Sequence, residues 1–223
     1  GVDFTEGQTL RYKFTSKKDI TLYWEPDDKK TSSKVDKYME YSEIVMAYTP
    51  VEVDPYGLTT VKAECERVTT RREDSKGKST AKPDAVGYLK GKSFELTVRP
   101  DGTIEDYSGL EKIVKEAVES SFRKGTKGVR IKEPEMISDF IATQWFLWDV
   151  VSSIENPADG VKIGHSWESV LSAPTPFITR RPRKVVYTLS SIDTSGEENL
   201  AKINARFSPD EQLPENFVIP YEG

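Results

Sequence analysis

The stretch from Pro134 to Ile154 is the longest strongly apolar run in the chain, and it constrains the fold more than any other feature. A proline at its start, followed by Glu135 and Asp139, is typical of a helix N-terminus. At about 100° per residue, the large apolar side chains fall on one face. The pattern therefore predicts a helix over 134–154. Its core-facing residues are expected to be Ile137, Phe140, Ile141, Leu147, Trp148, Val151 and Ile154.

Three other residues of this predicted helix draw attention as ligand contacts. Gln144 falls in the middle of the apolar face, where its amide needs a buried partner. Trp145 and Phe146 fall on the polar face, where leaving both rings in water forgoes about 1.5–3 kcal/mol each. We expect them to be covered by the loop 173–182 or by a helix over 110–122. The alternative is an apolar ligand site formed by Gln144, Trp145, Phe146 and Trp148.

Composition excludes several classes of protein. A net charge of −5, with 31% charged residues, argues against a general nucleic-acid binder. No apolar run reaches about 18 residues, so no segment is predicted to span a membrane. The single cysteine, Cys65, excludes an internal disulfide and a cysteine-based metal cluster, and the single histidine, His165, excludes a histidine-rich site. We therefore predict no metal and no cofactor.

Alternating apolar and polar residues predict strands on both sides of the helical region. A tight turn at 17–19 is expected to divide the first strands, and a phase slip before Val68 suggests a β-bulge. Residues 71–85 are polar and read as a mobile loop. The fold class predicted is α+β, as a single domain over 1–223. A large curved antiparallel sheet of about ten strands (8–107 and 161–219) is expected to carry helices 109–122 and 134–154 on its concave face.

The candidate catalytic residues are few. Glu43, Glu64 and Glu66 lie on predicted strands, where a glycosidase-type pair of carboxylates could be built, but nothing in the sequence brings two of them together. The serine next to His165 has the wrong geometry for a catalytic triad, and Cys65 reads as a small buried residue. No catalytic residue is predicted.

Basic residues gather in one short segment near the end of the chain. The plain interpretation is a solvated loop. The functional interpretation is a site for an anionic partner, such as a phospholipid head group or a polyanionic glycan. The residues of this patch are Arg180, Arg181, Arg183 and Lys184.

Two segments carry turn and packing residues with a recognisable spacing: FELTVRPDGTIEDYSGLEKIV (94–114) and VKIGHSW (161–167). They resemble a pattern in uncharacterised secreted or lipoprotein-type bacterial envelope proteins, where an F-x-V-x-P-x-G-x-V hairpin precedes a short helix. The resemblance covers about a third of the chain and implies an exported protein, but no catalytic residue. Gly1 in place of an initiator methionine is consistent with a removed export signal. A weaker, architectural similarity is to half-barrel lipoprotein carriers.

The function expected from the sequence is an exported, non-enzymatic binding or structural module of the bacterial cell envelope. Its location is expected to be secreted, periplasmic or envelope-anchored. Its partner is expected to be an apolar small molecule or an envelope protein. Two alternatives stay open: a lipid or lipoprotein carrier with an apolar cavity beside the central helix, and a carboxylate-dependent glycan hydrolase.

Overall fold

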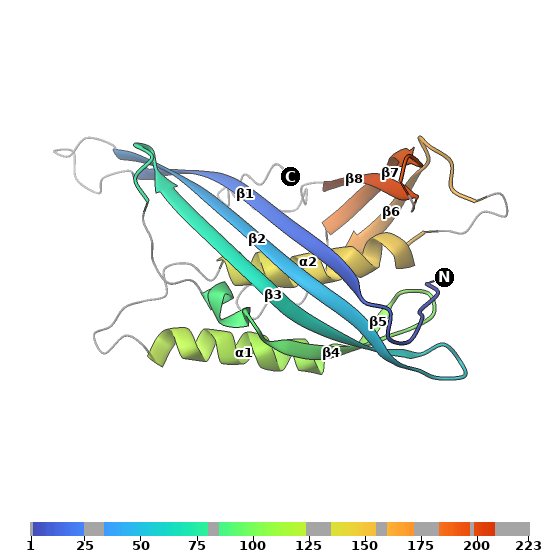
Figure 1. Cartoon of the computed structure of the whole chain (residues 1–223). Coiled ribbons are helices and arrows are strands. Elements are labelled where there is room, and N and C mark those ends of the chain that lie inside the picture. The colour runs from blue at the N-terminus through green and yellow to red at the C-terminus, as the bar shows by residue number, and fades with distance from the viewer. Residues whose placement is uncertain are drawn as a thin grey trace. The chain divides into compact units, whose positions relative to one another are not determined.

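The computed structural model describes residues 2–24, 34–79, 85–123, 135–154, 160–171, 183–196 and 199–207, and it is built mainly of antiparallel strands (Figure 1). Five of them form sheet A, in the order β1-β2-β3-β4-β5. The bounds of these strands are β1 (Leu10–Trp24), β2 (Lys34–Val53), β3 (Thr59–Asp74), β4 (Ser93–Val98) and β5 (Ile104–Asp106).

Three later strands form sheet B, and two α-helices and one 3₁₀-helix complete the described elements. None of the described helices is long and apolar enough to span a membrane. The bounds are η1 (Ala85–Leu89), α1 (Ser108–Arg123), α2 (Glu135–Ser152), β6 (Ser166–Leu171), β7 (Arg183–Asp193) and β8 (Leu200–Phe207).

The chain divides into two compact units. One comprises 3–99 and 104–140, with sheet A, η1, α1 and the first turns of α2. The other comprises 1–2, 100–103 and 141–223, with the rest of α2 and sheet B. The division falls inside α2, between Phe140 and Ile141.

The prediction of one curved sheet with about ten strands is wrong, because the described residues form sheets of five and three strands. One reason is that 10–24 is a single strand where two were predicted. Another is that residues 85–89, which lie within the range 8–107 assigned to the first strands, form the 3₁₀-helix η1. Residues 208–219, predicted as strand, lie outside the described residues.

Strand β1 continues through the turn predicted at 17–19, because charged partners hold Lys18 on the inner face of sheet A. Lys18 lies directly opposite Glu40 of β2. Its Nζ is 2.8 Å from Oδ1 and 2.6 Å from Oδ2 of Asp139 in α2. On the other side of Glu40, Arg72 of β3 places its Nε 2.8 Å from Glu40 Oε1. A row of charge thus crosses three strands on a face that is otherwise largely apolar.

The bulge predicted before Val68 is confirmed. Val45 pairs with Arg67 and Met46 pairs with Cys65, so Glu66 is the extra residue of β3. The bulge reverses the phase of the strand, which brings Arg72 to the inner face. β3 then continues to Asp74, inside the segment predicted to be a loop.

Helix α1 confirms the helix predicted over 109–122, and it buries an apolar stripe formed by Leu110, Ile113, Val114 and Ala117. At its N-terminus, Asp106 accepts hydrogen bonds from Ser108 N at 2.9 Å and from Ser108 Oγ at 3.2 Å. At Gly109 the helix approaches β4 so closely that an added Cβ would lie 2.8 Å from Glu95 O. The glycine therefore permits the contact between α1 and β4.

Candidate functional site

A polar cluster in the unit that contains sheet B is centred on Asp149 of α2. Its Oδ2 accepts a hydrogen bond from Tyr187 OH at 2.5 Å, and its Oδ1 accepts one from Ser169 Oγ at 2.8 Å. Its backbone oxygen accepts the Ser153 hydroxyl at 2.6 Å, and Ser153 Oγ accepts the indole N–H of Trp167 at 3.1 Å. One acidic residue therefore ties the C-terminal half of α2 to β6 and β7.

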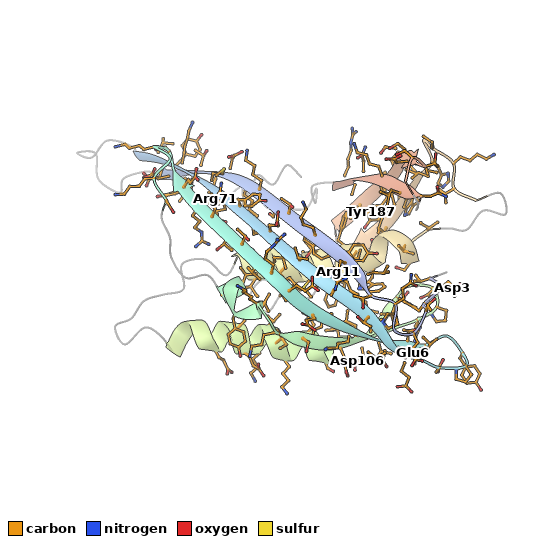
Figure 2. The ribbon with its side chains drawn as sticks, viewed as in Figure 1. Asp3, Glu6, Arg11, Arg71, Asp106 and Tyr187 are labelled. Atoms are coloured by element: carbon orange, nitrogen blue, oxygen red, sulfur yellow. The ribbon has the colours of Figure 1, made fainter. Side chains whose placement is uncertain are left out.

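Aromatic rings surround this cluster. The rings of Trp167 and Tyr187 are 5.5 Å apart, and Phe146 meets Tyr187 edge-on at 5.6 Å. Tyr187 is fully buried, and Figure 2 marks it within sheet B. Burial, followed by the hydrogen bond and the negative charge of Asp149, raises the pKa of Tyr187. The tyrosine is therefore a neutral hydrogen-bond donor over the physiological pH range, which suits a structural role.

The four residues predicted to contact a ligand lie in different environments. Gln144 is fully buried, as expected from its place in the stripe, and Trp148 is also buried. Phe146 packs against the apolar core of sheet B. This core belongs neither to the loop 173–182 nor to the helix over 110–122, the two segments predicted to cover the ring. Trp145 is half-buried. Val151, predicted as core, is 39% exposed.

Half of the predicted anionic-partner patch falls outside the described residues, namely Arg180 and Arg181. Arg183 begins β7, and Lys184 follows it. Lys184 Nζ lies 2.7 Å from Glu168 Oε2 of β6, and both side chains are exposed. The described part of the patch therefore contains an ion pair, which lowers its attraction for an anion.

The carboxylates considered for hydrolysis are engaged on the outer face of sheet A. Glu43 accepts hydrogen bonds from Arg67 at 2.9 Å and from Tyr41 at 3.2 Å. Glu66 pairs with Arg11 at 3.0 Å, and Glu64 pairs with Lys62 at 3.3 Å. Each carboxylate thus has a positively charged partner, and these ion pairs account for all three as parts of the fold.

The remaining reactive side chains occupy positions that explain them structurally. Cys65 is buried on the inner face of sheet A, and burial raises the pKa of its thiol to about 11. His165 is exposed, with its ring stacked 6.3 Å from that of Trp167. Within the described ranges, no three histidine, cysteine, aspartate or glutamate side chains gather as metal ligands.

Comparison with known proteins gives no further guidance. No family model, curated protein or solved structure matches this chain.

A feature that the sequence analysis missed is the free edge of sheet A. β1 is the first strand in the sheet order, and β2 is its only hydrogen-bonded neighbour among the described strands (Figure 1). Tyr23 is 76% exposed, and Val35, its direct neighbour on β2, is 48% exposed. Leu10, Tyr12 and Leu22 of the same strand are also exposed. The turn predicted at 17–19 divided 10–24 into two short strands, so the sequence analysis did not predict one long exposed edge.

Proposed function

We propose that this chain is an exported, non-enzymatic protein-binding module of the bacterial envelope, and that it binds its partner along β1. The observation that carries the proposal is the exposed apolar edge strand. An edge presents unpaired backbone N–H and C=O groups that another strand can bind. Soluble proteins usually shorten or cover such edges, whereas β1 is 15 residues long.

The side chains of β1 support binding at this edge. Tyr12 stacks on Phe14 at a ring distance of 6.4 Å and meets Tyr48 edge-on at 5.7 Å. Its ring is thereby fixed in place while remaining exposed, so a partner can bury it with little loss of side-chain entropy. Tyr23 offers a second aromatic contact toward the other end of the strand. Aromatic residues of this kind supply much of the binding energy at protein interfaces.

The placement of the ionisable residues favours binding over catalysis. Glu43, Glu64 and Glu66 are held in ion pairs, and Asp149 is held by hydrogen bonds from Ser169 and Tyr187. These contacts account for the carboxylates as parts of the fold. The export component of the proposal is supported by the resemblance of segments 94–114 and 161–167 to envelope proteins.

Photo-crosslinking in the cells that make this protein tests the proposal. A benzoylphenylalanine in place of Tyr23 should form a crosslink to one discrete envelope protein. The matched control is the same replacement at Tyr56, which is 90% exposed but lies in the turn between β2 and β3. It should give no specific crosslink.

Equal crosslinking at both positions, or none at either, would contradict binding along β1. A second assay addresses catalysis directly. Chromogenic ester and glycoside substrates should show no turnover above background, and a turnover that Glu43→Gln abolishes would overturn the non-enzymatic assignment.

A further inference from the structure

We propose that the segment bound by β1 is an acidic, extended peptide that adds to sheet A as a new strand. This inference rests on the proposed function and specifies the chemistry of the partner. β1 carries four basic side chains and one acidic one, Asp19. The basic residues are Arg11, Lys13, Lys17 and Lys18.

Two of these four charges are already used within the fold. Arg11 pairs with Glu66 across the outer face, where Figure 2 marks it, and Lys18 pairs with Asp139. In contrast, Lys13 and Lys17 are exposed and have no ion-pair partner among the described residues. They lie on the same face of the edge strand, four residues apart, so both are available to a strand added beside β1.

The same two lysines argue against a second copy of this chain as the occupant. An antiparallel copy of β1 would bring a basic strand against a basic strand, and like charges on neighbouring strands repel. Lysines on an edge also discourage pairing with neutral strands. A partner strand with acidic residues converts this repulsion into attraction, and it is therefore the occupant that the charges favour.

The geometry of the strand sets the spacing of the partner's side chains. In an antiparallel added strand, two acidic residues four positions apart would lie opposite Lys17 and Lys13. The side chains of opposite parity would lie on the inner face, beside Phe14, Tyr12 and Leu10, where apolar residues fit. The predicted partner segment thus alternates acidic residues on one face with apolar residues on the other.

The test measures binding of a synthetic peptide that has two glutamates four residues apart. The positions of opposite parity, whose side chains would lie on the inner face, are valines. We expect saturable binding by the whole chain that weakens as salt is raised, because exposed charge pairs are screened. Lys13→Glu/Lys17→Glu should weaken binding at least about tenfold, from two lost attractions and two new repulsions. The control Lys90→Glu/Lys162→Glu makes the same change of net charge at exposed positions outside β1 and β2 and should leave binding within about twofold.

Backbone methylation of the peptide separates strand addition from simple charge attraction. An added strand directs alternate N–H groups toward β1, so methylating one alternate set should abolish binding and methylating the other should not. If both methylated peptides bind equally, or if glutamine replaces glutamate without loss, the inference fails.

Absence of peptide binding also overturns the inference. If Tyr23 nevertheless crosslinks to an envelope protein, only the chemistry assigned to the partner is wrong. If Tyr23 does not crosslink, the proposed function fails as well.

Discussion

At the scale of single residues, several side chains are fixed by contacts between segments far apart in the sequence. Asp149 is the clearest example, because Ser169 and Tyr187 reach it from two later strands. Nothing in the sequence near Asp149 indicates this role. A polar residue close to Trp145 and Phe146 on the polar face of the helix is expected to face solvent, whereas here Asp149 and Phe146 both contact sheet B.

Replacing Tyr187 by phenylalanine tests the structural role of Asp149. The ring and its packing are kept, but the carboxylate loses its shortest hydrogen bond. We expect the free energy of unfolding in urea to fall by about 1.5–3 kcal/mol, the range for a hydrogen bond to a charged group. Tyr56→Phe, in an exposed turn, should change it by less than about 0.5 kcal/mol. Equal effects of the two substitutions would show that the Asp149 contact is unimportant.

Gly109 makes a second residue-scale prediction. A methyl group at this position would lie 2.8 Å from Glu95 O and 3.0 Å from Glu95 N, so α1 would have to move away from β4. Gly109→Ala should lower stability by about 1–3 kcal/mol despite the better helix propensity of alanine. Gly87→Ala is the control, since nothing lies within 4 Å of its added Cβ. A Gly109→Ala protein that melts at or above the parent temperature would contradict the close approach.

The thiol of Cys65 makes a prediction about pH. Burial raises its pKa from the usual 9.0 to about 11. Because the unfolded chain loses this proton at lower pH than the folded chain, the unfolding free energy should fall as pH rises through this interval. Cys65→Ala should remove this part of the pH dependence, measured by urea unfolding at pH values across the same window. Identical slopes for parent and variant would show that the folded thiol ionises normally.

At the scale of elements, local sequence patterns predicted individual elements better than they predicted how the strands are arranged. The helix over 109–122 and the bulge before Val68 were predicted from the sequence, and both are confirmed. The prediction of a turn at 17–19 was wrong. It was made because three successive charged residues usually interrupt a strand, but β1 continues through them. The apolar residues occupy even-numbered positions on both sides of this segment, which was the available sign that β1 continues. They are Leu10, Tyr12 and Phe14 before it and Ile20 and Leu22 after it.

The buried pair of Glu40 and Arg72 gives a prediction for β2 and β3. Both side chains are less than one-tenth exposed, and the second oxygen of Glu40 has no hydrogen-bond partner. Arg72→Met should cost about 3–5 kcal/mol, because it leaves a buried carboxylate without its positive partner. The double variant Glu40→Leu/Arg72→Met should recover most of that loss in urea unfolding. A double variant as unstable as Arg72→Met alone would contradict the direct coupling of the two charges.

At the scale of the whole molecule, the sequence could not show which elements belong together. The alternation of apolar and polar residues is the same whether strands join one sheet or two. The division of the chain inside α2 has no marker in the sequence. The candidate binding edge was missed for a related reason, because an edge is defined by which strands do not pair. Its charges were visible in the sequence, but their position on an edge strand required the pairing of the whole sheet.

The central claim is that the edge of β1 is open and receives a partner strand. Amide hydrogen exchange, resolved residue by residue along β1, tests it most directly. In the free protein, alternate amides of 10–24 should exchange fast while their neighbours, bonded to β2, exchange slowly. The acidic peptide should slow the fast set. Uniformly slow exchange in the free protein, or no change when the peptide is bound, would contradict the claim.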